Sequence, residues 1–161
     1  MEDEVDDVIG AWRRERPDLV TDPMRIWSRI KRLGLHLDAA RHAAYGAHGL
    51  DDYEFDVLAA LRRAGAPYRL SPGQLAAATH VTSGTMTNRV DRLAGRGFVV
   101  RASHPDDGRA VLVEMTPAGR EVVDAAMSSL LAAEEALLAS LPMQARERLA
   151  DDLRALLVIQ S

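Results

Sequence analysis

The sequence predicts a mainly α-helical fold with a small β-wing, built as a winged helix-turn-helix between helical segments. Three observations predict this fold class. Residues 71–96 have the pattern of a helix, a short turn and a second helix. Residues 98–113 have the pattern of two strands joined by a turn. Helical segments with apolar stripes lie on both sides of this part.

Three helices are predicted before residue 65, over residues 3–15, 23–45 and 51–64. Each has apolar residues at the three- and four-residue spacing that places them on one helix face. Asp22 and Pro23 give the second helix an N-cap and a first-position proline. We expect the apolar faces to be buried; they consist of Val5, Val8, Ile9 and Trp12, then Ile26, Ile30, Leu33 and Leu37, then Phe55, Leu58 and Leu61.

The helix-turn-helix is predicted from its caps. Ser71 with Gln74 three residues later forms a capping box that begins the first helix. The second helix begins near Thr82 or Ser83, and either residue is a suitable N-cap. Its inward positions are Met86, Val90 and Leu93. The outer positions are polar and can hydrogen-bond to bases or phosphates; they are Ser83, Thr85, Thr87 and Asn88. One buried stripe and one polar face are what a helix in a DNA major groove requires.

The predicted wing consists of β-rich runs at residues 98–101 and 110–113, with turn-forming residues 105–108 between them. Arg109 lies at its tip. A guanidinium on a rigid loop can read a narrow minor groove, where negative potential is concentrated. The alternative role for Arg109 is an ion pair with Asp107 that braces the loop, and the two roles are compatible.

After the wing, a long helix is predicted from Thr116 and Pro117 to about Ser140, and a last helix follows Pro142. Together with the N-terminal helices they carry more apolar surface than one small subunit needs. This surplus predicts a homodimer interface, although a single subunit can also use such faces for its own core. We expect one domain, with residues 1–64 as N-terminal helices, 65–115 as the DNA-binding lobe and 116–161 as dimerisation helices.

Composition narrows the possible functions. The 161-residue chain has no cysteine, which excludes thiol chemistry, and it has no apolar stretch near the roughly 20 residues of a membrane span. Its acidic opening MEDEVDD differs from a secretion signal, so we expect a cytoplasmic protein with no membrane partner. Taken over the whole chain, the net charge of −4 argues against DNA binding. However, residues 69–109 hold six arginines against three aspartates, where DNA would bind.

The wing sequence HPDDGRAVLVEMTPAGRE resembles that of the MarR family of bacterial transcriptional regulators. The resemblance is to an Asp-x-Arg wing, an apolar strand and a Thr-Pro-x-Gly helix start, which correspond here to Asp107, Arg109, Thr116, Pro117 and Gly119. Met115 replaces the more usual leucine of the family. The resemblance implies a homodimeric, ligand-responsive regulator, usually a repressor, that binds a pseudo-palindromic double-stranded DNA operator. The candidate DNA-binding residues are Ser71, Thr82, Ser83, Thr85, Thr87, Asn88, Arg92 and Arg109.

The helix ending near Trp12 is similar to an extra N-terminal helix in the urate-responsive branch of that family. The branch has an anion-sensing site made of a tryptophan, an aspartate and two arginines twelve residues apart. By resemblance these are Trp12, Asp56 in EFDVLAAL, Arg89 in MTNRVDRL and Arg101. The implied ligand is a small anionic metabolite, either a urate or purine-type anion or a polycarboxylate such as citrate or aconitate.

The residues themselves suggest how such a switch would work. Asp56 follows Phe55 on a largely apolar helix, and a buried carboxylate needs a cationic partner. Arg89 and Arg101 are the candidates, and an anionic ligand would compete with Asp56 for them. Trp12 would supply a flat apolar wall. The alternative is a structural salt bridge and a core tryptophan.

Other functions have less support in the sequence. The five histidines, His36, His42, His48, His80 and His104, do not have the spacing of a metal site, so neither a metal nor a cofactor is predicted. No nucleophile motif such as Gly-x-Ser-x-Gly occurs, and no enzyme activity is predicted. The alternative functions are a winged-helix module that binds proteins and a DNA binder without a ligand switch. A steep loss of DNA affinity with rising salt would separate a DNA reader from a protein-binding module.

Overall fold

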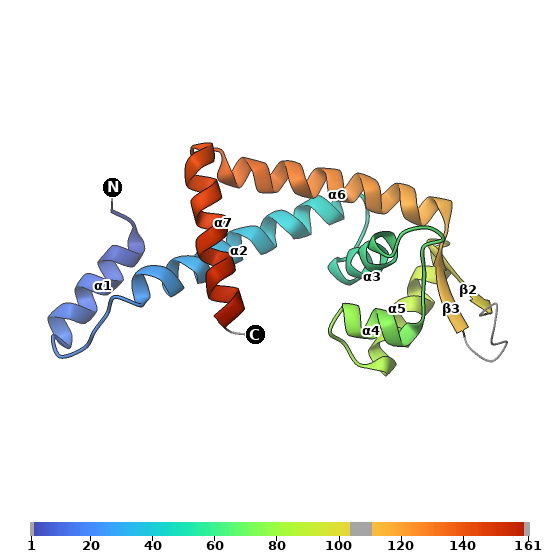
Figure 1. Ribbon diagram of the computed structural model, residues 1–161, viewed down its shortest axis with the longest axis horizontal. Coiled ribbons are helices and arrows are strands. Elements are labelled where there is room, and N and C mark those ends of the chain that lie inside the picture. Colours follow the sequence, from blue (N-terminus) through green and yellow to red (C-terminus); the bar gives the residue numbers. More distant parts are fainter. Residues whose placement is uncertain (1, 104–110, 160–161) are drawn as a thin grey trace. The chain divides into compact units, whose positions relative to one another are not determined.

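The computed structural model describes residues 2–103 and 111–159. It confirms the mainly helical fold with a small antiparallel sheet (Figure 1). The chain groups into two compact units, residues 1–40 and 41–161. Within the described ranges, no helix combines the length and apolar character needed to cross a membrane.

The first unit contains helix α1 (Glu4–Glu15) and most of helix α2 (Met24–Gly46). Arg29 of α2 holds α1 by donating to the carboxylates of Asp3 and Asp6, each at 2.8 Å. The predicted apolar faces are only partly buried. On α1, two of the four stripe residues are buried and the other two, Val8 and Trp12, are exposed. On α2, Ile26 and Leu33 of the predicted stripe are also exposed.

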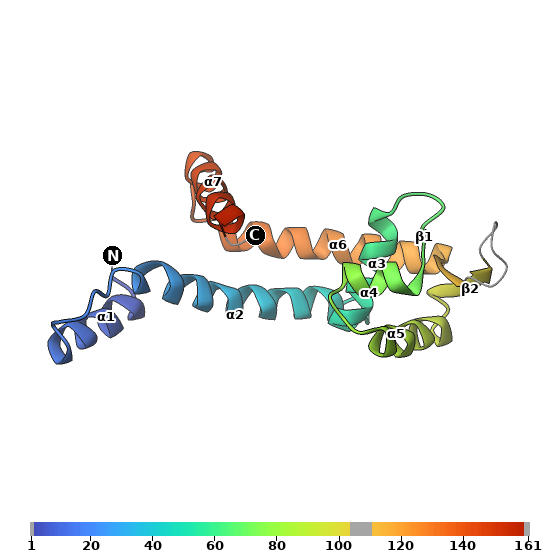
Figure 2. The same ribbon diagram turned by 60° about the horizontal axis from the view of Figure 1, so that its bottom comes forward.

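The second unit contains the helix-turn-helix. Helices α3 (Asp52–Arg63), α4 (Pro72–Ala78) and α5 (Ser83–Gly95) pack on one another through a shared apolar core. The predicted capping box at Ser71 is present, and Gln74 supplies its second half. Thr82 is the N-cap of α5, so the helix begins where the sequence predicts. Figure 2 shows α3, α4 and α5 beside the sheet.

The sheet has three strands in the order β1-β3-β2, all antiparallel. Strands β2 (Val99–Ser103) and β3 (Val111–Met115) form the predicted hairpin, and each extends further toward its C-terminal end than the sequence indicated. The pairing begins at Val99 opposite Met115, and both side chains are buried in the core. Strand β1 (Arg69–Leu70) was not predicted, since two residues are too few to show an alternating pattern.

Helix α6 (Pro117–Leu138) leaves the sheet, and helix α7 (Met143–Ile159) follows it. Thr116 begins α6 by accepting a hydrogen bond from the Gly119 N–H at 3.0 Å and donating one to the Gly97 carbonyl at 2.7 Å. One face of α6 packs on α3 through its buried residues Val123, Ala126 and Leu130. This face fixes the start of α6 against the winged helix-turn-helix.

Candidate nucleic-acid interface

Helix α5 has the two faces that the sequence predicts. Its inward residues, Met86, Val90 and Leu93, have no exposed surface. The residues predicted to contact DNA along this helix are all exposed; they are Thr82, Ser83, Thr85, Thr87, Asn88 and Arg92. The helix therefore presents a polar surface to solvent while its opposite side anchors it in the core. Such an arrangement is suited to insertion into a major groove.

Several hydroxyl groups on this surface already have partners within the protein. Thr82 accepts from the Thr85 N–H, and the two threonine hydroxyls lie 3.0 Å apart. Thr87 donates to the carbonyl of Ser83 at 3.1 Å. Ser71 accepts from the Gln74 N–H as a helix cap. Among the described residues, the side chain of Asn88 makes no hydrogen bond, so its amide is available for base recognition.

The arginines of residues 69–109 are more often paired with carboxylates than the sequence indicated. Arg69 pairs with Glu114 at 2.9 Å, Arg101 pairs with Asp91 at 2.6 Å, and Arg96 pairs with Glu54. Glu54 and Glu114 lie outside the segment in which the charges were counted, so the excess of positive charge is smaller than that count indicated. Arg89 and Arg92 have no carboxylate partner in the described part of the chain.

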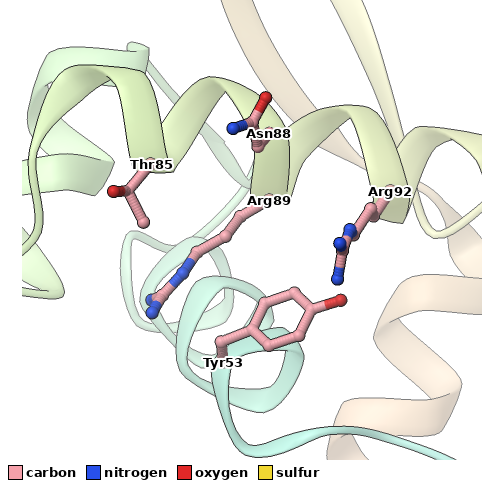
Figure 3. A pocket seen from close by; sticks show the side chains of 5 residues that line it. All are labelled: Tyr53, Thr85, Asn88, Arg89 and Arg92. Atoms are coloured by element: carbon pink, nitrogen blue, oxygen red, sulfur yellow. The ribbon is translucent and has the colours of Figure 1, made fainter.

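Both of these arginines meet Tyr53 of α3 (Figure 3). The Arg89 guanidinium lies over the Tyr53 ring, 5.3 Å from its centroid. The Arg92 guanidinium donates to the Tyr53 hydroxyl, and this hydrogen bond raises the pKa of Arg92 above its ordinary value. Together with Thr85 and Asn88 they line an open pocket of about 220 Å³, called here the Tyr53 pocket.

The expected pairing of Asp56 with Arg101 is wrong, because Arg101 is held by Asp91. Asp56 is also exposed rather than buried. No cation in the described part of the chain lies within ion-pair distance of it, although the nearby Arg89 stabilises its charge. Partial removal of water by its surroundings raises the pKa of the Asp56 carboxyl, and Arg89 offsets part of the rise. Asp56 instead borders a pocket of about 340 Å³ between the end of α2, α3 and α6, which also has Arg41, Arg62 and Arg63 in its lining.

The other candidate residues lie in the first unit or outside the described residues. Trp12 is 47% exposed on α1, in the first unit. Arg109 and Asp107, the predicted wing tip, lie outside the described residues. The described ranges contain no group of three or more histidine, aspartate or glutamate side chains placed to hold a metal ion.

Comparison with known proteins identifies the family. Residues 48–110 match the sequence model of the MarR family. The HTH-type transcriptional regulator PecS of Dickeya dadantii (strain 3937) is 38% identical over 121 residues, which span 75% of this chain and 73% of PecS. The chain belongs to the MarR family. It is therefore a DNA-binding transcriptional regulator, as the wing sequence indicated, and not an enzyme.

Solved structures agree with this assignment. A mutant of MarR from E. coli, in complex with operator DNA, superimposes with a TM-score of 0.70 over 86% of this chain and 98% of that protein. At 23% identity this likeness shows the shared fold. CouR from Rhodococcus jostii RHA1, crystallised with p-coumaroyl-CoA, has a TM-score of 0.64 at 26% identity, over 79% of this chain and 87% of CouR.

Two structural features of this MarR-family chain were missed by the sequence analysis. One is Tyr53, which no motif marks. The other is the contact of Arg96, the C-cap of α5, with Glu54, which is 2% exposed. Arg96 also donates to the Gly49 carbonyl at 2.8 Å and lies over the Phe98 ring. The Asp51–Glu54 spacing reveals a capping box, but the partner from α5 lies 42 positions away and leaves no local signal.

Proposed function

We propose that this MarR-family regulator is a homodimeric repressor that binds a pseudo-palindromic operator and is released from it by a small anionic metabolite. The observation that carries the proposal is the exposed polar face of α5 above a fully buried stripe. Thr85, Asn88 and Arg92 lie exposed on this face and are the proposed DNA contacts. The wing residue Arg109 is proposed as a minor-groove contact on the strength of the family resemblance.

The apolar surface of the C-terminal helices supports a homodimer. Six large apolar residues of α6 and α7 are between 38% and 67% exposed in the single chain; they are Met127, Leu131, Leu137, Met143, Leu149 and Leu153. Burying such a surface against a second copy removes it from water, which is the main driving force of association. A two-fold dimer presents two copies of α5 to successive major grooves, about 10 base pairs apart.

The first prediction concerns this geometry. Footprinting on DNA from the regulator's own promoter region should show two protected half-sites about one helical turn apart, and sedimentation should show a dimer at the same protein concentration. Affinity should fall steeply as salt rises, because arginines displace counterions from phosphates. Protection of a single half-site by a monomer would contradict the dimer. Binding that is insensitive to salt would favour the protein-interaction alternative.

We propose that the ligand switch centres on Asp56 and Arg89; Arg101 and Trp12 are proposed as further members from the family resemblance alone. Arg89 is held by an aromatic ring rather than by a carboxylate, which leaves its N–H edge available to an anion. The pKa of Asp56 is raised by partial desolvation and lowered by the charge of Arg89, so a change in nearby cations would alter the energy of its charge. A urate or purine-type anion, or a compact polycarboxylate such as citrate, would attract Arg89 and Arg101 and thereby change how α5 is presented.

The second prediction tests this switch. Thermal-shift measurements with urate, citrate and aconitate should identify a stabilising anion, and that anion should weaken DNA binding by about 5- to 150-fold, or roughly 1–3 kcal/mol. DNA should weaken binding of the anion by the same factor, since coupling is reciprocal. Trp12→Ala should abolish the response. The matched control is Trp27→Ala, an exposed tryptophan in the same unit, which should respond as wild type does.

The result for Trp12→Ala decides where the ligand binds. If this variant binds DNA normally and is still released by the same anion at the same concentration, the ligand site lies elsewhere. The pocket bordered by Asp56, Arg41 and Arg63 would then be tested with the same anions.

A further inference from the structure

The Tyr53 pocket brings together Arg89 and Arg92, the two arginines of residues 69–109 that lack a carboxylate partner within the described part of the chain. Arg69, Arg96 and Arg101, the other described arginines of this segment, are neutralised by Glu114, Glu54 and Asp91. Unpaired positive charge is thus concentrated at one place on α5. An anion at this place would meet the donors of Arg89, Arg92, Thr85 and Asn88 within one pocket.

The pocket lies along the flank of α5 that faces α3. Arg89 adjoins the buried stripe and is half-buried, whereas Asn88 is at the exposed outer side of the helix. When a helix lies in a major groove, base edges are beneath its outer side and the phosphate backbones run along its flanks. We therefore expect the flank next to α3 to meet a backbone phosphate rather than a base.

The Tyr53 hydroxyl has a proton that it can donate to such a ligand. Its oxygen accepts the hydrogen bond from Arg92, so its own proton remains available to a second oxygen atom. Figure 3 shows the hydroxyl directed toward Arg92, with Arg89 at the ring. The ring supports one guanidinium by its face and the hydroxyl supports the other. A single side chain thereby contacts both arginines before DNA arrives.

We propose that Tyr53 is a DNA-binding and positioning residue, which donates to one backbone phosphate of the operator and holds Arg89 and Arg92 toward it. This inference rests on the proposed DNA-reading role of α5. The contact is with phosphate, so it adds affinity without adding sequence preference.

The test measures binding of Tyr53→Phe to an operator duplex and to an unrelated duplex over a series of salt concentrations. Phenylalanine keeps the ring under Arg89 and removes only the hydroxyl. Loss of a charge-assisted hydrogen bond network should weaken binding about tenfold on both duplexes. Arg92→Met should weaken binding and lower the slope of log affinity against log salt by about one unit. In the Arg92→Met background, Tyr53→Phe should cost less than about threefold, since the two residues act on one phosphate.

The matched control is Tyr68→Phe, because Tyr68 is also half-buried and also contacts two arginines, Arg62 of α3 and Arg120 of α6. This variant should bind both duplexes as wild type does, and all variants should keep the wild-type melting temperature within a few degrees. Wild-type affinity of Tyr53→Phe would overturn the proposal. So would a loss that is fully additive with Arg92→Met, or one that accompanies an equal fall in stability. If the wild-type protein binds neither duplex, the proposed DNA-reading role fails instead, which is a distinct outcome.

Discussion

Replacing Gly119 with alanine should lower the free energy of unfolding by about 3 kcal/mol, because the new methyl group has no space. A Cβ atom at this position would lie 2.1 Å from the carbonyl oxygen of Phe98 and 3.1 Å from the Met115 side chain. The nearer atom belongs to the backbone and cannot rotate away. Either α6 or the start of the wing must therefore shift. Urea unfolding followed by circular dichroism measures the loss.

Gly34→Ala is the matched control. Gly34 is also within a helix, but nothing lies within 4 Å of the position that its Cβ would take. Since alanine is the better helix former, this variant should be as stable as wild type or more stable by up to about 1 kcal/mol. Equal stability of Gly119→Ala and Gly34→Ala would show that α6 moves away from Phe98 without cost.

The same contact explains the Thr-Pro-x-Gly sequence at the start of α6. Thr116 caps the helix and donates to the Gly97 carbonyl, while its own N–H donates to the Phe98 carbonyl at 3.0 Å. The two backbones approach so closely that only glycine fits at residue 119. The direction of α6 relative to the wing is thus set by a backbone-to-backbone contact. A variant that loosens this contact should weaken DNA binding as well as stability.

Local signals account for the parts of the fold that the sequence predicted correctly. The caps at Ser71, Thr82 and Thr116 are hydrogen bonds between residues three apart, so the residues that form them are visible in a short window. The buried stripe of α5 follows from helical spacing alone. The Thr-Pro-x-Gly sequence was recognised by its resemblance to a family, and only the structure supplies its physical reason.

Charge pairing across the chain could not be predicted in this way. Glu54 and Glu114 neutralise arginines that lie 42 and 45 positions from them, and such partners depend on how the elements pack. For the same reason the sequence offered both Arg89 and Arg101 as partners of Asp56, whereas the structure pairs Arg101 with Asp91. Tyr53 was missed because a tyrosine in a helix has no distinctive pattern until its neighbours in space are known.

The second large effect is expected at the contact between Glu54 and Arg96. Glu54 is almost fully buried, and besides Arg96 it accepts only the Asp51 N–H at 3.0 Å among the described residues. Arg96→Met removes the charge that stabilises this buried carboxylate, so we expect a loss of about 3 kcal/mol in the free energy of unfolding. Glu54→Gln should cost less, about 1 kcal/mol, because the Arg96 side chain can be hydrated when its partner is neutral. That side chain is 38% exposed.

The double variant makes this prediction decisive, because the large loss in Arg96→Met comes from an unpaired buried charge rather than from lost packing. Adding Glu54→Gln to Arg96→Met removes that charge, so the double variant should be more stable than Arg96→Met alone by about 1–2 kcal/mol. Urea unfolding of the four proteins at pH 7 measures the cycle. If the double variant is less stable than Arg96→Met, the contribution of Arg96 comes from its stacking on Phe98 and its bond to Gly49. Helix α5 would then be held at its C-terminal end by packing rather than by charge.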